Sequence, residues 1–258
     1  MTRRAAVVTG ASRGLGRGIA VALAADGCDV VVNWSRSEDE AKATVVAVED
    51  AGGQAVPVQG DVVDPAVSAL LVETARDAFG GLDVWVNNAG VSVLGPVIDT
   101  PVTDMERMIA VNVLGTFHGL QAAAHAMVAA GTHGRIVNVG SEASVLTFKY
   151  LGAYAATKFA IVGLTQAAAL ELGEHGITVN AVGPGTAETD MVMAERRSEV
   201  ALTGRTPEEV RASYLDAIPL GRFCEPEDAG ALVAWLASPA AAYVTGQVFL
   251  TNGGSVLH

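Results

Sequence analysis

Cysteine is scarce in this sequence and follows no recognisable pattern. Only Cys28 and Cys224 occur among its 258 residues. Two cysteines at this separation match neither a metal-binding motif nor a disulfide framework. We therefore expect no metal site and two buried thiols in a reducing compartment, as in a cytoplasmic protein.

Basic residues and long apolar runs are also few. The chain has 16 Lys and Arg against 28 Asp and Glu, a net charge of −12. Such an acidic surface repels phosphate backbones, so we expect no nucleic-acid partner. No stretch reaches the roughly 20 apolar residues of a membrane-spanning helix, and the run Ala5–Val8 is too short for a signal-peptide core. We expect a soluble protein with no membrane partner.

Apolar residues, in contrast, make up half of the chain, and 17% is charged, which excludes a disordered protein. Short β-branched runs alternate with longer Ala-rich runs. The expected strands are Ala5–Thr9, Asp29–Asn33, Gln54–Gln59, Leu82–Asn87, Gly134–Val139, Ile177–Val182 and Val244–Leu250. The expected helices are Leu15–Ala25, Glu38–Ala51, Pro65–Phe79, Thr103–Ala130, Ala153–Glu174 and Pro226–Ala237.

This alternation predicts an α/β fold. Most strand candidates are nearly continuous apolar runs, which is typical of strands covered by helices on both faces. Alternating strands and helices imply a parallel sheet with crossover helices. We expect one Rossmann-type doubly wound domain over residues 1–258, with about seven strands. The segment 188–214 has no strand signal and follows the sixth strand, so we expect a substrate lid there, or else a helical excursion that closes the core.

A glycine-rich turn follows the first expected strand. It reads Thr9-Gly-Ala-Ser-Arg-Gly-Leu-Gly16, and a helix follows it. Glycines at 10, 14 and 16 permit a tight turn whose amides approach a phosphate. The position between a strand and a helix predicts dinucleotide binding.

The second strand carries the signal for cofactor choice. NAD-binding proteins usually place an acidic residue at its end, on the ribose 2′-hydroxyl. Here the chain reads Asn33-Trp-Ser-Arg36, and the first acid is Glu38. Arg13 and Arg36 suit a 2′-phosphate by charge and geometry, although both could be solvated surface residues. We predict that NADP is preferred, with NAD possible.

Polar residues also follow the next two strands, as Gly60-Asp-Val62 and Asn87-Asn-Ala-Gly90. At the carboxyl ends of parallel strands they could bind an adenine edge or cap the following turns.

The catalytic candidates are a tyrosine and a lysine four residues apart, Tyr154 and Lys158. This spacing puts both on one helix face, where an ammonium would lower the pKa of the phenol. Tyr154 could then act as a general acid or base near neutral pH. Ser141 ends the preceding strand and could hold a substrate oxygen or cap a turn. Asn112 interrupts the apolar face of a predicted helix. It could form hydrogen bonds in the core, or it could bend the helix.

Taken together, these motifs resemble the classical short-chain dehydrogenase/reductase family over nearly the whole chain. The glycine turn, Asp61, Asn87-Asn-Ala-Gly90, Asn112, Ser141, Tyr154, Lys158 and Pro184-Gly185 have the usual order and spacing. The segments Ile218–Gly221, Glu225–Asp228 and Tyr243–Gly246 are similar to those of 3-oxoacyl-[acyl-carrier-protein] reductases and bacterial glucose 1-dehydrogenases.

The resemblance implies a catalytic tetrad of Asn112, Ser141, Tyr154 and Lys158. Ser141 would orient the carbonyl, Tyr154 would exchange the proton and Asn112 would position a relay water. Lys158 would lower the pKa of Tyr154 and bind the nicotinamide ribose. The expected cofactor contacts are Gly10, Ser12, Arg13, Gly14, Leu15, Gly16, Asn33, Ser35, Arg36, Asp61, Val62, Asn88, Ala89, Gly90, Tyr154, Lys158, Pro184, Gly185 and Thr189.

The favoured function is an NADP(H)-dependent oxidoreductase acting on a small ketone or secondary alcohol. A sugar 1-dehydrogenase and a non-catalytic dinucleotide sensor stay open as alternatives. We expect the pocket wall to come from Ser92–Leu94, Glu142–Leu146, Tyr150 and Glu188–Tyr214. Its apolar residues Val93, Leu94, Val145 and Leu146 indicate an apolar pocket with few polar anchors, or else belong to the core. Two helices, Thr103–Ala130 and Ala153–Glu174, are apolar beyond one buried stripe, and with the resemblance they predict a homotetramer.

Overall fold

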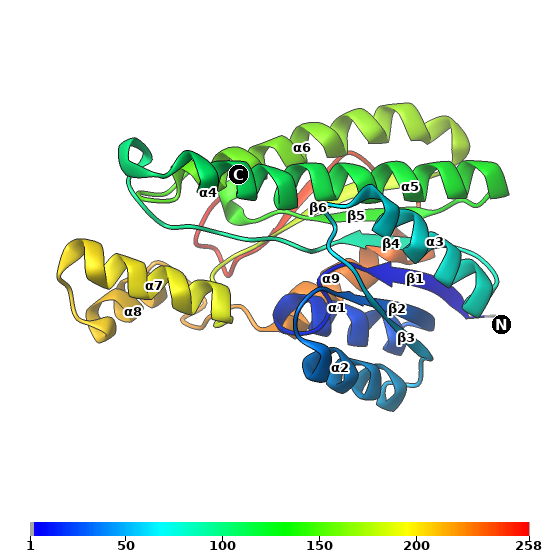
Figure 1. Cartoon of the computed structure of the whole chain (residues 1–258), viewed down its shortest axis with the longest axis horizontal. Coiled ribbons are helices and arrows are strands. Elements are labelled where there is room, and N and C mark those ends of the chain that lie inside the picture. The colour runs from blue at the N-terminus through cyan, green and yellow to red at the C-terminus, as the bar shows by residue number, and fades with distance from the viewer. Residues whose placement is uncertain (1–2, 258) are drawn as a thin grey trace.

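A seven-stranded parallel sheet, covered by helices on both faces, forms the centre of the computed structural model (Figure 1). The structure describes residues 3–257. The strands lie in the order β3-β2-β1-β4-β5-β6-β7, and each neighbouring pair is parallel. The order reverses between β1 and β4, and ligands of such folds bind at this switch point. The predicted fold class is confirmed.

The element bounds follow the predicted alternation. The strands are β1 Arg4–Val8, β2 Cys28–Trp34, β3 Ala55–Gln59, β4 Val84–Asn87, β5 Arg135–Val139, β6 Thr178–Pro184 and β7 Val248–Thr251. The helices are α1 Gly14–Ala25, α2 Glu38–Asp50, α3 Pro65–Phe79, α4 Val102–Met108, α5 Gly115–Ala130, α6 Gly152–Leu172, α7 Asp190–Thr203, α8 Pro207–Asp216 and α9 Pro226–Ala237. Of those described, no helix is both long and apolar enough to cross a membrane.

The last strand begins later than its sequence predicts. Strand β7 begins at Val248, whereas the apolar pattern predicts a strand from Val244. Gly246 has a φ of +74°, which is incompatible with extended strand backbone. The Thr245 hydroxyl instead accepts a hydrogen bond from the Val179 amide, so this segment forms a turn beside β6.

The long helix predicted over Thr103–Ala130 is also interrupted. Between α4 and α5 the chain forms a wider π-helical turn, Ile109–Leu114. Such turns occur inside helices, often at functional sites. Asn112 lies within the turn, and its carbonyl accepts a hydrogen bond from the Thr116 hydroxyl. A single uninterrupted α-helix is therefore the wrong prediction for this segment.

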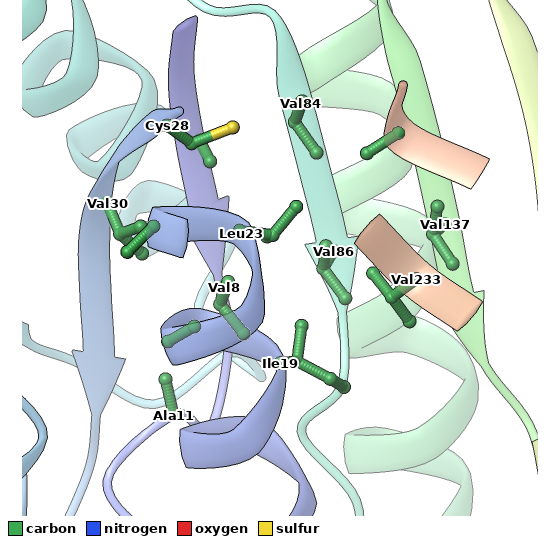
Figure 2. Close-up of a cluster of buried hydrophobic side chains, with 14 of the residues drawn as sticks. Val8, Ala11, Ile19, Leu23, Cys28, Val30, Val84, Val86, Val137 and Val233 are labelled. Atoms are coloured by element: carbon green, nitrogen blue, oxygen red, sulfur yellow. The ribbon is translucent and has the colours of Figure 1, made fainter. Parts of the chain in front are cut away.

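The core has two parts, one on each face of the sheet. On one face, Ile19 and Leu23 of α1 pack over valines of the central strands, among them Val8 and Val86 (Figure 2). Helix α9 contributes Val233 to the same cluster. On the other face, α3, α5 and α6 cover the sheet, with Trp85 of β4 fully buried beneath them. Burial on both faces accounts for the nearly continuous apolar strands.

Helices α1 and α9 pack closely because Gly18 has no side chain. A Cβ at Gly18 would lie 2.6 Å from the Pro226 carbonyl oxygen and 2.7 Å from its carbonyl carbon. We expect Gly18→Ala to lower the free energy of unfolding by about 1–3 kcal/mol, because backbone must move to admit the methyl group. Urea unfolding would measure this loss. Gly81→Ala is the control, since its Cβ would have no neighbour within 4 Å, and equal stability of both variants would contradict the prediction.

Segment 188–214 contains helix α7 and most of helix α8, so it is helical, and its role as a substrate lid stays a prediction. In Figure 1 these two helices (yellow) project from the end of the molecule opposite the N-terminus. Glu188 holds them together, because its carboxylate pairs with Arg196 of α7 and with Arg211 of α8, each at 3.0 Å. The two helices thus form one small unit beside the ends of the strands.

Candidate active site

The glycine turn between β1 and α1 is shaped by close backbone contacts. Gly10 and Gly14 have positive φ angles of +60° and +53°. A Cβ at Gly10 would lie 2.9 Å from the Ala89 Cα, and a Cβ at Gly16 would overlap the Gly10 carbonyl. Any larger residue would fill this cradle. The residues therefore fit a dinucleotide phosphate, which needs close approach to backbone amides at a helix N-terminus.

Two other predicted cofactor segments converge on this turn. The Asn88 side-chain amide donates to the carbonyls of Thr9 and Gly10, at 2.9 and 3.0 Å. The Thr189 side chain lies 3.3 Å from the position of a Cβ on Gly14. The turn, the end of β4 and the start of α7 are thus brought together at the switch point of the sheet.

Two exposed cationic side chains lie at the predicted cofactor end, Arg13 in the glycine turn and Arg36 beyond β2. Arg13 forms ion pairs with Glu40 and Asp190, at 3.3 and 3.0 Å. Arg36 is exposed and makes no ion pair or hydrogen bond within residues 3–257. Exposed ion pairs contribute little to stability, so the pairs of Arg13 can be exchanged for a phosphate at little cost. Both guanidinium groups are therefore accessible to a phosphate.

Other predicted cofactor residues have structural contacts of their own. The buried Asn33 side chain accepts from the Gly10 amide and donates to the carbonyls of Val58 and Gly60. The Asp61 carboxylate accepts from the Val63 amide, as a turn cap does. Ser12 is partly buried and Ser35 exposed, while Val62 packs against Gly115. Asn33 therefore ties strand ends together and has no free polar atom directed at a ribose.

The four predicted catalytic residues lie close together. The Ser141 side chain is close enough to the Tyr154 phenol to lower its pKa, and the Lys158 Nζ lies 5.6 Å from the Tyr154 ring centroid. A Cβ at Gly90 would be 3.5 Å from Asn112 Oδ1 and 3.6 Å from Lys158 Nζ. The end of β4, the π-helical turn, the end of β5 and helix α6 therefore supply one constellation.

Asn112 is held by three hydrogen bonds. Its Oδ1 accepts from the Val91 amide at 2.8 Å, and its Nδ2 donates to the Val91 carbonyl and the Thr157 hydroxyl, each at 2.9 Å. The side chain is fully buried. The polar atoms of Asn112 thus fix the loop after β4 against α6. Thr157 completes this positioning contact, and the sequence motifs did not indicate Thr157.

Burial of the Tyr154 phenol, rather than the charge of Lys158, has the largest effect on the pKa of Tyr154. Desolvation raises the pKa of the phenol well above its ordinary 10.0, the nearby Glu195 carboxylate raises it further, and the Ser141 hydrogen bond lowers it. Lys158 Nζ donates instead to the Val139 carbonyl, at 3.0 Å. The net shift of the phenol pKa is therefore upward, so the phenol keeps its proton at neutral pH, and a lowering of that pKa by Lys158 stays a prediction.

Lys158 carries a desolvation cost of its own. Burial lowers its pKa from 10.5 to about 8. Below pH 8 the ammonium is charged in both the folded and the unfolded chain, so the cost is fully present. Between about pH 8 and 10.5 the folded chain loses the proton first, and stability rises with pH.

We therefore expect Lys158→Met to raise the free energy of unfolding at pH 7 by about 1–3 kcal/mol, because the buried charge is removed. Urea unfolding at pH 7 and pH 10 would show this gain shrinking as the pH rises. Lys149→Met, on the exposed loop before α6, is the control without such a gain. A Lys158→Met variant that is less stable than the parent at pH 7 would contradict the prediction.

A cavity of about 320 Å³ opens beside this constellation. Ser141, Tyr154, Pro184, Gly185 and Thr189 line it, so it joins the proposed cofactor end to the catalytic end. Leu15 of the glycine turn also reaches it.

The cavity wall is largely apolar, as the sequence predicts, and two of the predicted segments supply much of it. Ala143, Met191 and Val192 line it, together with three carboxyl side chains, Glu142, Glu195 and Glu199.

The four apolar residues expected in the wall lie elsewhere. Val93 packs with Met108 and Tyr154 in a small core cluster, and Leu146 is half exposed. Leu94 is buried, and neither it nor Val145 lines the cavity. These four residues are therefore a wrong prediction for the wall, and for Val93 and Leu94 the reason is that the loop after β4 folds into the core.

Comparisons with known proteins agree with this geometry. The family model described as short chain dehydrogenase matches residues 4–200. The L-2,3-butanediol dehydrogenase of Corynebacterium glutamicum is 41% identical over 97% of this chain and 98% of its own length. The 3beta-hydroxysteroid dehydrogenase 1 of Eggerthella lenta is 38% identical over 98% and 93%. The crystal structure of acetoin dehydrogenase from Enterobacter cloacae superposes with a TM-score of 0.84, at 37% identity, over 99% of this chain and 96% of that one.

Proposed function

Because this chain belongs to the short-chain dehydrogenase family, we propose that it interconverts a ketone and a secondary alcohol with NADP(H) as the preferred cofactor. The observation that carries the proposal is the convergence of Ser141, Tyr154 and Lys158 at one end of a cavity that the glycine turn also reaches. Membership of the family makes the chain an oxidoreductase; the cofactor preference and the residue roles are our proposal.

In the proposed reduction, Ser141 holds the substrate carbonyl oxygen and Tyr154 donates its phenolic proton to that oxygen. NADPH, when bound, supplies the hydride that the carbonyl carbon receives. The carbonyl thus gains one hydride and one proton and becomes a secondary alcohol. In the reverse direction Tyr154 takes the proton from the hydroxyl. Lys158 binds the nicotinamide ribose, and Asn112 fixes the loop that shapes this end of the site.

The decisive test is turnover itself. Purified protein, NADPH or NADH and a small diketone should show loss of the reduced-nicotinamide absorbance, faster with NADPH. A panel of ketones and secondary alcohols with both cofactors would then rank substrates. Binding of NADPH without turnover of any member of the panel would favour the dinucleotide sensor instead.

We also propose a homotetramer with closed symmetry. Phe117 and Leu114 on the α5 side and Phe159 on α6 are each about 40–46% exposed. A second apolar surface contains Trp235 of α9 and Tyr243. Exposed apolar residues at two separate places need two kinds of interface.

Light scattering at micromolar concentration should therefore give four times the chain mass of 26.3 kDa. A monomer mass would contradict the proposal, and a dimer would mean that only one of the two surfaces is used.

A further inference from the structure

The chain after β5 forms a tight hydrogen-bonded turn that begins at Ser141. A single 3₁₀ turn, Glu142–Ser144, follows this serine, and the Ser144 amide donates to the Ser141 carbonyl at 2.9 Å. Two side-chain hydrogen bonds close the turn in both directions. The Ser141 hydroxyl oxygen accepts from the Ala143 amide, and the Ser144 hydroxyl oxygen accepts from the Ser141 amide, each at 3.1 Å. This reciprocal pattern is a capping box.

The turn is packed against the helix that carries Tyr154. Ala143 and Ser144 are almost completely buried. Ala143 belongs to the same small apolar cluster as Tyr154 and Ala155 of α6. The turn therefore sets the position of Ser141 relative to Tyr154, and a change in the turn would shift one of the two hydroxyl groups against the other.

Ser144 acts from outside the cavity wall. Ser141, Glu142 and Ala143 line the cavity, whereas Ser144 is not among its lining residues. A Cβ at Gly140 would lie 2.6 Å from the Ser144 hydroxyl oxygen, so a side chain at position 140 would displace this hydroxyl from the Ser141 amide. Glycine at position 140 and serine at position 144 are therefore both needed for the capping box.

The capping box determines which part of the Ser141 hydroxyl is free. A serine hydroxyl has one proton and two lone pairs. Because the Ala143 amide occupies one lone pair, the oxygen is held in one place and its proton points away from the turn. A carbonyl oxygen in the cavity can accept this proton. The donor is thus oriented before the substrate binds, which lowers the cost of reorganisation during the reaction.

We infer that Ser144 is a positioning residue for the reaction: it holds the Ser141 amide, and through the capping box it directs the Ser141 hydroxyl at the substrate carbonyl oxygen. Ser144 itself contacts neither substrate nor cofactor. This inference rests on the proposed function, in which Ser141 holds that oxygen.

A double-mutant cycle tests this role, because a positioning residue affects catalysis only through the residue that it positions. Ser144→Ala should lower kcat for ketone reduction roughly tenfold, the effect of losing one hydrogen bond and misplacing a donor. NADPH should bind this variant with nearly the parent Kd. In the Ser141→Ala background the same substitution should change kcat by less than about twofold.

A second variant disturbs the same hydrogen bond from the other side. Gly140→Ala keeps the Ser144 hydroxyl but displaces it from the Ser141 amide, so kcat should again fall roughly tenfold. This variant carries the cycle with Ser141→Ala alone should Ser144→Ala not fold. Ser238→Ala is the matched control and should keep the parent kcat. The Ser238 hydroxyl also caps a 3₁₀ turn, by accepting a backbone amide at 3.2 Å, and lies outside the cavity wall.

The outcomes separate this inference from the proposed function. An equal loss of kcat in the parent and Ser141→Ala backgrounds would show that the capping box serves only stability. That result, or a parent-like kcat of Ser144→Ala, would overturn this inference and leave the proposed function standing. If Ser141→Ala itself kept the parent kcat, or if the parent protein reduced no member of the ketone panel, the proposed function would fail and this inference would fail with it.

Discussion

Replacing Tyr154 with Phe should lower kcat by at least roughly 100-fold, the usual effect of losing a general acid or base. The substitution removes only a hydroxyl, and the ring keeps its place in the cluster with Met108 and Ala155. Because burial keeps the phenol protonated, this hydroxyl can serve as the proposed proton source at the Ser141 end of the cavity. Steady-state kinetics of ketone reduction would measure the loss.

Cofactor affinity separates a catalytic role of Tyr154 from a structural one. NADPH should bind Tyr154→Phe with nearly the parent Kd, as measured by fluorescence titration. Tyr243→Phe, which removes a phenolic hydroxyl outside the cavity and keeps the ring of the proposed interface, is the matched control and should keep the parent kcat. Near-normal turnover of Tyr154→Phe would remove this residue from the mechanism.

Replacing Arg13 and Arg36 together with Ala should weaken NADPH binding by roughly 10- to 100-fold and leave NADH binding almost unchanged. Losing a charge-assisted contact to phosphate costs about 1.5–3 kcal/mol, and only NADPH carries the 2′-phosphate. Arg36 has no protein partner within the described chain, and the ion pairs of Arg13 are exposed and weak. The guanidinium groups are therefore free to bind the phosphate.

Titration of each variant with both cofactors would measure this difference. Arg76→Ala, on the exposed face of α3, should change neither affinity and serves as the control. Equal weakening of NADPH and NADH would show that the two arginines contact a part common to both cofactors, and the NADP preference would then be withdrawn.

Local signals in the sequence were enough to predict the sheet, because a strand buried on both faces needs a run of apolar residues wherever it occurs. Likewise, the glycine turn and the Tyr154–Lys158 spacing are properties of a few consecutive residues. Backbone geometry then places Gly10, Gly14 and Gly16 at one helix N-terminus, and the two catalytic candidates on one face of α6.

What the sequence did not indicate depends on contacts between distant segments. Asn112 lies in the π-helical turn and forms hydrogen bonds with Val91 and Thr157, which lie 21 and 45 residues away in the sequence. The raised pKa of Tyr154 and the lowered pKa of Lys158 follow from burial by several elements at once.

The choice of which side chains in the predicted wall segments face the cavity is the clearest case. In the sequence Glu195 is one acid among many in a mixed segment, and its helical spacing from Val192 and Glu199 gives only a shared face. Which way that face points is decided where Glu188 joins α7 to α8 beside the sheet, and this packing buries Glu195 at the wall of the cavity. The sequence by itself determined the fold class and the residues that can exchange a proton and cradle a phosphate. Only the tertiary structure decided which polar groups face the substrate, because burial and pairing are properties of the assembled chain.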